Sequence, residues 1–187
     1  MKPLDLRVVK TKEALQEALL TLLNQKTLIS ISVTEICKLA KINRGTFYSH
    51  YGQVEELFEE YFKEIMKDLA SSYKEPYRHV RTLDPKHLNP GTIRIFHHIE
   101  KHKKFYRIVF SKQVPFSYYH LLYDQVCGLM KNDSGIQNQI TSAPSMVSAY
   151  QANAILGMVI EWHKEDFRQS ANEMNVLLVQ ILNKNLS

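Results

Sequence analysis

The residues of this chain that are best suited to chemistry lie in one short stretch, INRGTFYSHYGQVEEL, at positions 42–57. This stretch combines a basic side chain, a glycine and several hydroxyl groups: Arg44, Gly45, Thr46, Tyr48 and Ser49. An arginine can donate two parallel hydrogen bonds to O6 and N7 of a guanine, and hydroxyl groups can bind phosphate oxygens. These residue types therefore point to nucleic acid as the ligand.

Each polar residue of this stretch has a distinct expected role on DNA. A glycine costs about 1 kcal/mol relative to alanine inside a helix, but on an exposed face it lets the backbone approach DNA closely. The threonine can donate to a base or touch a thymine methyl group. The predicted base contacts are Arg44, Gly45 and Thr46. The predicted phosphate contacts are Tyr48, Ser49 and, at the start of the preceding helix, Thr34.

Two short helices joined by a turn must position these residues. Ser32 and Glu35 form a capping-box pattern, which predicts the start of the first helix. Asn43 is a good N-cap for a second helix of about two turns, and Gly52 should end it. The intervening turn, Lys41–Asn43, has the length found in helix-turn-helix motifs, whose second helix enters the major groove.

The rest of the chain also predicts helices, so the expected fold class is all-α. Proline and glycine are scarce, at six each, and the alternating pattern of β-strands is nearly absent. Three prolines predict a linker over Glu75–Gly91. The other expected helices span about Asp5–Asn24, Gln53–Tyr73, Asn89–His102, Lys103–Phe110, Phe116–Lys131, Pro144–Phe167 and Ser170–Lys184.

Charge and hydropathy narrow the class of protein. Residues 1–52 carry a net charge of +4, residues 53–75 carry −4, and residues 76–187 carry +5. A basic N-terminal block suits a polyanion. No signal-like segment opens the chain, and the longest apolar run, Ala154–Ile160, is far below the ~20 residues of a membrane helix. We therefore expect a cytoplasmic protein that does not bind membranes.

Signs of catalysis or of metal binding are weak. Cys37 and Cys127 form no spaced metal or disulfide framework. His98 and His102 lie one helical turn apart, but no third ligand is near them in the sequence, so no metal site is predicted. No nucleophile–base order, carboxylate pair or phosphate loop stands out. We therefore expect neither an enzyme nor a cofactor.

The stretch VTEICKLAKINRGTFYSHYGQVEELF resembles the DNA-binding signature of the TetR family of bacterial transcriptional regulators, and KTKEALQEALLTLLNQK resembles the first helix of that family. The resemblance implies an all-helical homodimer, usually a repressor, whose C-terminal domain senses a ligand. It assigns the base and phosphate contacts given above and adds a supporting role at the phosphates for His50. Where many members have a phosphate-binding lysine at the start of the fourth helix, this chain has Val54.

On this basis we predict a helix-turn-helix DNA-binding domain over residues 1–52, a connecting helix over 53–73, and a helical ligand-sensing and dimerisation domain over 74–187. In the TetR family, aromatic rings of the C-terminal domain often line a ligand cavity. Ordinary core packing is the alternative. The predicted pocket for a small apolar or aromatic effector comprises Phe96, Phe105, Tyr106, Tyr119, Tyr123, Tyr150 and Trp162.

The last two helices are predicted to form a four-helix interface between two subunits. The helix Pro144–Phe167 is apolar nearly all round, which implies burial on both sides. Burial of both helices inside one subunit is the alternative. The predicted interface residues are Ala149, Ala154, Gly157, Met174, Leu177, Leu178 and Ile181.

Three functions fit the sequence. The first is a repressor that binds a palindromic operator in double-stranded DNA and is modulated by a small-molecule effector. The second is a DNA-binding activator or co-regulator that is switched by a protein partner. The third is a helical adaptor with no role on DNA, against which the exposed Arg44 and Gly45 argue.

Overall fold

The structure of this chain is a computed structural model, and it describes residues 6–75, 88–131 and 143–184. Over these residues the regular elements are nine α-helices and two 3-10 helices, with no strand, as expected for an all-α protein. None of the helices in the described ranges combines the length and the apolar character that a membrane span requires.

The chain divides into two compact units, and each unit combines two segments of sequence. Unit 1 comprises Met1–Ile65 and Ile108–Phe116, and unit 2 comprises Met66–Arg107 and Ser117–Ser187. The two segments of unit 1 are joined by a hydrogen bond, which the Leu28 N–H donates to the Gln113 carbonyl oxygen at 2.7 Å. Two helices, α4 and α6, contribute residues to both units.

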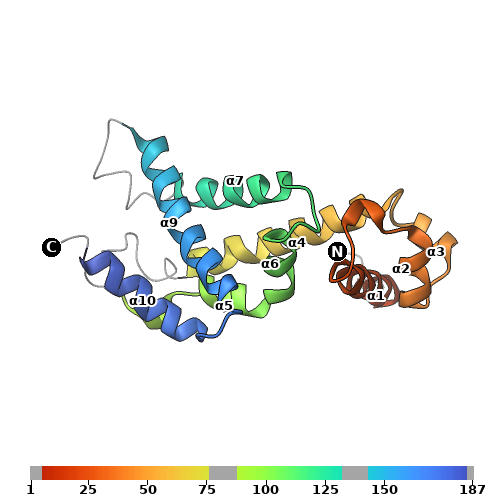
Figure 1. The fold of residues 1–187 in the computed structure, drawn as a ribbon, viewed down its shortest axis with the longest axis horizontal. Coiled ribbons are helices and arrows are strands. Elements are labelled where there is room, and N and C mark those ends of the chain that lie inside the picture. The colour runs from red at the N-terminus through yellow and green to blue at the C-terminus, as the bar shows by residue number, and fades with distance from the viewer. Residues whose placement is uncertain (1–5, 76–87, 132–142, 185–187) are drawn as a thin grey trace. The chain divides into compact units, whose positions relative to one another are not determined.

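Unit 1 is built from short helices at the red and orange end of the chain (Figure 1). Its elements are α1 (Leu6–Leu23), the 3-10 helix η1 (Leu28–Ser30), α2 (Val33–Ala40), α3 (Arg44–Tyr48) and the first part of α4 (Val54–Lys74). The predicted first residue of α1, Asp5, lies outside the described residues.

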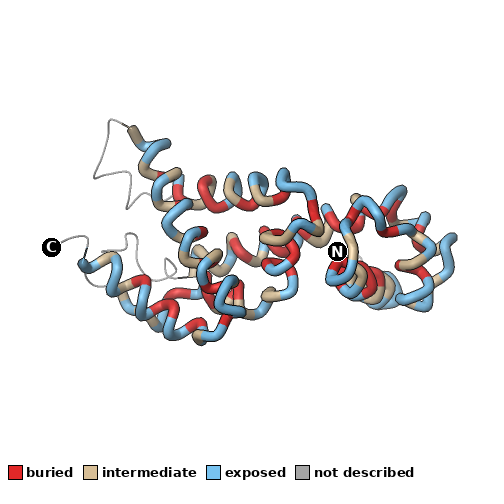
Figure 2. The backbone as a smooth tube through the Cα atoms, in the orientation of Figure 1, coloured by how far each residue is buried: buried red, intermediate tan, exposed pale blue. Residues whose placement is uncertain are grey.

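A shared apolar core fixes these helices. In Figure 2 buried residues alternate with exposed ones along each helix. The side chains of unit 1 with no exposed surface come from four of its α-helices: Leu15 and Leu19 of α1, Ile36 of α2, Phe47 of α3, and Leu57 and Phe58 of α4. Each such side chain contributes about 1.5–3 kcal/mol through burial. The five residues of α3 are too few for an independent helix, so the packing of Phe47 holds it.

The end of the predicted second helix of the motif differs from the expectation. α3 ends at Tyr48, and Ser49 follows it as the C-cap. Gly52 was expected to end this helix, but no described glycine has a positive φ. The Gly52 N–H instead donates to the Glu56 carboxylate at 2.7 Å. Gly52 therefore belongs to the start of α4 and not to the end of α3.

Unit 2 contains the remaining helices (Figure 1). They are the second part of α4, the 3-10 helix η4 (Pro90–Thr92), α5 (Ile95–Lys101), α6 (Lys103–Val109, in part), α7 (Ser117–Lys131), α9 (Pro144–Lys164) and α10 (Ala171–Lys184). α7 packs on α9, and α10 packs on α5 and η4. A capping box starts α10, because the Ser170 N–H donates to the Glu173 carboxylate at 2.7 Å and the Glu173 N–H donates to the Ser170 hydroxyl at 3.3 Å.

Two predicted helices of unit 2 have other bounds in the structure. The single helix expected over Asn89–His102 is split into η4 and α5. Asn89 caps η4 by accepting the Gly91 N–H at 2.9 Å, but Ile93 is extended, with ψ 127°, so one continuous helix cannot form. α9 ends at Lys164, three residues before the predicted end, because Asp166 and Phe167 both have a φ of 55°.

The burial of Val54 yields a test of the fold. Val54 begins α4 and is only 5% exposed, so it is a packing residue of unit 1. Val54→Lys should forfeit about 1.5–3 kcal/mol of burial, which lowers the melting temperature by roughly 3–10 °C for a chain of this size. Gln53→Lys is the matched control, since Gln53 is exposed. Equal melting temperatures for the two variants would show that Val54 is not part of the core.

Candidate nucleic-acid interface

Helices α2 and α3 form a helix-turn-helix whose first helix is capped by its own sequence. The Ser32 N–H donates to the Glu35 carboxylate at 3.0 Å, and the Glu35 N–H donates to the Ser32 hydroxyl at 3.3 Å. Lys26 also donates to the Glu35 carboxylate. These hydrogen bonds, with that from Lys26 the strongest cause, lower the pKa of Glu35 to about 2. The predicted capping box is therefore confirmed, and a lysine reinforces it.

The turn between the helices is set by two residues. Lys41 ends α2 in the left-handed conformation, with φ 57° and ψ 39°. Asn43 then begins α3, and its side-chain oxygen accepts the Thr46 N–H at 2.7 Å, which confirms the predicted N-cap. The direction of α3 relative to α2 is thus fixed by local hydrogen bonds at both ends of the turn.

The predicted DNA contacts lie mostly on the exposed side of this motif. Phe47 is fully buried, and the residues around it in α3 face outward. Tyr48, for example, is 50% exposed. The exposed members of the predicted set are Thr34, Arg44, Gly45, Tyr48 and Ser49, while Thr46 and His50 are half-buried.

Arg44 and Tyr48 form a pair one helical turn apart. The Arg44 Nη2 lies 3.4 Å from the Tyr48 hydroxyl oxygen, and the guanidinium carbon lies 5.8 Å from the centre of the tyrosine ring. This hydrogen bond raises the pKa of Arg44 further above its usual range. An exposed cation–π contact is worth only about 0.5–1 kcal/mol. The arginine is thus held near the helix surface but can leave the ring for a base.

Gly45 has a role that the sequence did not reveal. Its φ is not positive, so the position does not require the conformational freedom of glycine. A Cβ at this position would instead lie 3.3 Å from the Asn43 side-chain oxygen, which caps α3. A glycine at this position therefore leaves the Asn43 cap undisturbed, and it also adds no side chain to the exposed surface of α3.

Ser49 is less available for a phosphate than the sequence suggests. Its hydroxyl group donates its single hydrogen to the Thr46 carbonyl oxygen at 2.7 Å. A donated hydrogen bond from Ser49 to a phosphate would have to replace this bond. The Tyr48 side chain is exposed, and its hydroxyl oxygen accepts the hydrogen bond from Arg44, so its own hydrogen can be donated to a phosphate.

Comparison with known proteins identifies the family of this chain. A family model described as the TetR transcriptional regulator C-terminal region matches residues 86–184, which is more than half of the chain. The chain belongs to the TetR family. The members of this family are DNA-binding transcriptional regulators and not enzymes.

Relatives of this TetR-family regulator agree with the assignment. An uncharacterised HTH-type transcriptional regulator of Bacillus subtilis (strain 168), YxbF, is 44% identical over 59 residues, a match that spans 31% of this chain and 16% of that relative. The solved structure of DhaS, a dihydroxyacetone kinase operon activator, has a TM-score of 0.65 at 19% identity and covers 94% of this chain and 95% of its own. A second solved structure is that of NalD, the secondary repressor of the MexAB-OprM multidrug efflux pump in Pseudomonas aeruginosa. It has a TM-score of 0.64 at 16% identity, and the match covers 94% of this chain and 96% of NalD. At these identities the structures support the fold alone.

The aromatic residues predicted to bind an effector differ widely in burial in the described part of this TetR-family chain. Phe96, Phe105, Tyr106 and Trp162 are at most 2% exposed. They pack as ring pairs, with 5.9 Å between the centres of Phe96 and Trp162. Tyr150 is 71% exposed, and Tyr119 and Tyr123 are half-buried. A hollow of about 280 Å³ beside α9 and α10 is lined by Trp162 and by none of the other six rings.

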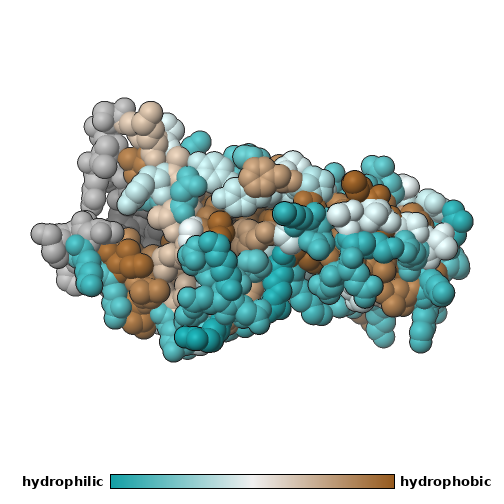
Figure 3. All heavy atoms as spheres, in the orientation of Figure 1, coloured by the Kyte–Doolittle hydropathy of each residue, from teal (hydrophilic) through white to brown (hydrophobic). Residues whose placement is uncertain are grey.

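The residues predicted for the dimer interface divide into two groups. Met174 and Leu178 are 4% and 9% exposed and belong to the core of unit 2. Ala154, Gly157, Leu177 and Ile181 are exposed, and Ala149 is half-buried. Figure 3 shows hydrophobic side chains gathered over α10 on the visible face. Part of the predicted set therefore packs within one subunit, and part leaves an apolar surface on α9 and α10.

The reinforced capping box predicts a specific pH dependence. The pKa of Glu35 is about 2 in the folded protein and 4.5 when unperturbed, so the unfolded chain binds more protons between these values. This contribution to stability is therefore present above pH 4.5 and is lost as the pH falls toward 2. Glu35→Gln removes the charge, so its deficit in unfolding free energy should be largest above pH 4.5 and shrink on acidification. Urea unfolding at pH 6, 4.5 and 3 measures this change.

Glu13→Gln, at an exposed carboxylate of α1, controls for the loss of one negative charge. A Glu35→Gln deficit that is the same at all three pH values would contradict the role given to the carboxylate.

Proposed function

We propose that this TetR-family regulator is a repressor that binds a palindromic operator as a homodimer, with α3 of each subunit in the major groove. The observation that carries the proposal is the outward face of α3, where Arg44, Gly45 and Tyr48 are exposed while Phe47 anchors the helix. A recognition helix needs this combination of a fixed backbone and free polar side chains.

In this proposal the residues of the motif have separate tasks. The base contacts are made by Arg44, Gly45 and Thr46, and the guanidinium of Arg44 leaves the ring of Tyr48 to reach a guanine. The phosphate contacts are made by Thr34, Tyr48, Ser49 and His50. Thr34 lies in the first turn of α2, where unpaired backbone N–H groups and the helix dipole favour an anion. The DNA-binding domain comprises residues 1–52, and the ligand-sensing and dimerisation domain comprises 74–187.

We further propose that a small apolar or aromatic effector in the C-terminal domain lowers operator affinity. The aromatic composition of the core of unit 2 supports an effector of this chemistry. The close packing of Phe96, Phe105 and Trp162 means that such an effector must displace rings to enter. The same packing also favours the second candidate, an activator or co-regulator switched by a protein partner, because such a partner would not need to enter the core.

Selection of bound sequences from random double-stranded DNA tests the central proposal. We expect enrichment of a palindrome whose half-sites are about one helical turn of DNA, 34–36 Å, apart. A transcription assay with the selected operator upstream of a reporter then separates a repressor from an activator. Failure to enrich any sequence would reject specific DNA binding by α3.

Arg44→Ala tests the assignment of base contact. Loss of a guanine contact should cost about 1–3 kcal/mol per half-site and relax the preference at one base pair. Tyr48→Phe is the comparison, because a lost phosphate bond should weaken all sequences alike. Binding of operator and of random duplex is measured for both variants at two salt concentrations. If Arg44→Ala lowers both affinities by the same factor, Arg44 contacts phosphate and not a base.

Gly157 tests the proposed dimer face of α9. It is exposed, and a Cβ added there would meet nothing within 4 Å in one subunit. If a partner helix packs against it, Gly157→Leu should overpack the interface by about 1–3 kcal/mol, which weakens dimerisation roughly 5- to 150-fold. Gly128→Leu in α7 is the matched control, since a Cβ there also meets nothing within 4 Å. Sedimentation equilibrium measures both dissociation constants, and equal values would remove Gly157 from the interface.

A further inference from the structure

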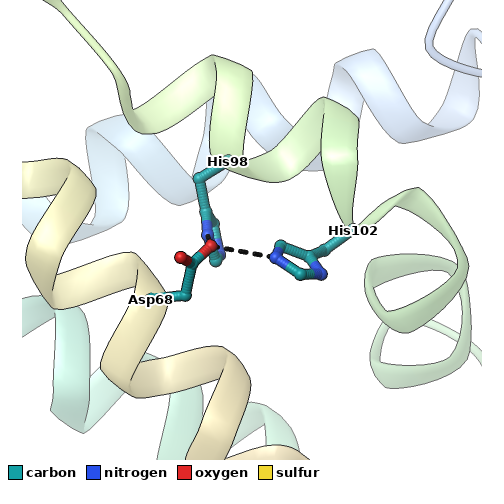
Figure 4. A group of neighbouring side chains, drawn as sticks. All are labelled: Asp68, His98 and His102. Atoms are coloured by element: carbon teal, nitrogen blue, oxygen red, sulfur yellow. Dashed lines mark hydrogen bonds and ion pairs between the residues drawn. The ribbon is translucent and has the colours of Figure 1, made fainter. Parts of the chain in front are cut away.

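Three side chains from two helices of unit 2 converge on one point (Figure 4). Asp68 lies in α4, His98 lies in α5, and His102 is the C-cap residue of α5. The Asp68 Oδ2 lies 2.8 Å from the His98 Nδ1 and 2.9 Å from the His102 Nε2. The sequence offered only the two histidines, because Asp68 is 30 positions before the nearer of them.

We propose that Asp68, His98 and His102 bind a divalent transition-metal ion of the zinc class. One carboxylate oxygen and two imidazole nitrogens, all within 4.8 Å of one another, form a common ligand set for such ions. Ligand atoms at about 2.0–2.1 Å from a tetrahedral ion lie roughly 3.3 Å apart. The two distances from Asp68 need to open by about half an ångström, and the two histidine nitrogens, which lie within 4.8 Å of each other, need to approach the same separation to admit the ion.

His98 has the supporting contact that metal-binding histidines use. Its other nitrogen, Nε2, lies 3.0 Å from the Tyr106 hydroxyl oxygen, and both side chains are at most 2% exposed. When Nδ1 binds the ion, the imidazole proton resides on Nε2 and is donated to the Tyr106 oxygen. This contact fixes both the orientation of the ring and the position of its proton.

An ion can reach the site and keep a position open for a further ligand. Asp68 and His98 line a cavity of about 290 Å³. The His97 Nδ1, on the same cavity, is buried and has no hydrogen-bond partner among the described residues. Three protein ligands beside a polar cavity leave the fourth position for water or a small anion.

Lys101 competes with the ion in the metal-free protein. Its Nζ lies 3.3 Å from the same Asp68 oxygen. The lysine side chain is 64% exposed, so it can turn to solvent when an ion binds. In the metal-free state these hydrogen bonds link α4 to α5, and the proposed ion would replace them with coordinate bonds.

Titration of the full chain, with any affinity tag removed, tests the site directly. Co²⁺ should bind one ion per chain with visible absorption bands stronger than those of the aqueous ion, and Zn²⁺ should displace it. Zn²⁺ at 100 times its dissociation constant should raise the melting temperature by roughly 5–10 °C. Both measurements are made without DNA, so their failure leaves the proposed DNA binding intact.

Four variants make the test specific. Asp68→Asn and His102→Gln should abolish the Co²⁺ bands, and His102 is the safer choice because its side chain is 17% exposed. Tyr106→Phe keeps all three ligands and should weaken binding by about 10- to 100-fold. His120→Gln, at an exposed histidine of α7, should bind as tightly as the wild type. Circular dichroism confirms that each variant is folded. Equal affinity in the wild type and His102→Gln, or no saturable binding by the folded wild type, would overturn the proposal.

Discussion

The proposed recognition helix of this protein, α3, depends on the burial of one aromatic ring. α3 has only five residues, and a helix of that length has too few internal hydrogen bonds to persist in water. Phe47, which is fully buried, anchors α3 in the apolar core of unit 1, where α3 packs on α2, while the Asn43 side chain caps its first turn. Because Phe47 alone anchors the helix, Arg44 and Tyr48 stay exposed and are available to a ligand.

The same division between anchor and ligand-facing residues explains the position of Val54. The first turn of α4 follows α3 directly, and in many TetR-family members a lysine there binds phosphate. In this chain the side chain is 5% exposed and belongs to the apolar core of unit 1. The proposed phosphate contacts therefore rest on the hydroxyl groups of Thr34, Tyr48 and Ser49 and on His50. Binding to DNA should accordingly neutralise fewer phosphates and depend less steeply on salt than with a lysine at this position.

Unit 2 combines a closely packed aromatic core with two surfaces that we propose bind partners, one apolar and one polar. The rings of Phe96, Phe105 and Trp162 fill the interior, so they stabilise the unit whether or not they also admit an effector. The exposed apolar residues of α9 and α10 suit a second copy of the chain. The polar cluster of Asp68, His98 and His102 suits a metal ion. An apolar effector and a metal ion would thus act on different parts of the same unit.

The sequence by itself determined the features that local hydrogen bonds and helical periodicity control. The caps at Ser32, Asn43 and Ser170 were predictable because each joins residues three positions apart. The helix-turn-helix signature likewise lies in one continuous stretch. Only the tertiary structure decided that Val54 is buried and that Asp68 meets His98 and His102. These outcomes depend on side chains brought together from separate helices. The spacing of residues along one helix does not show which other helix will pack against them.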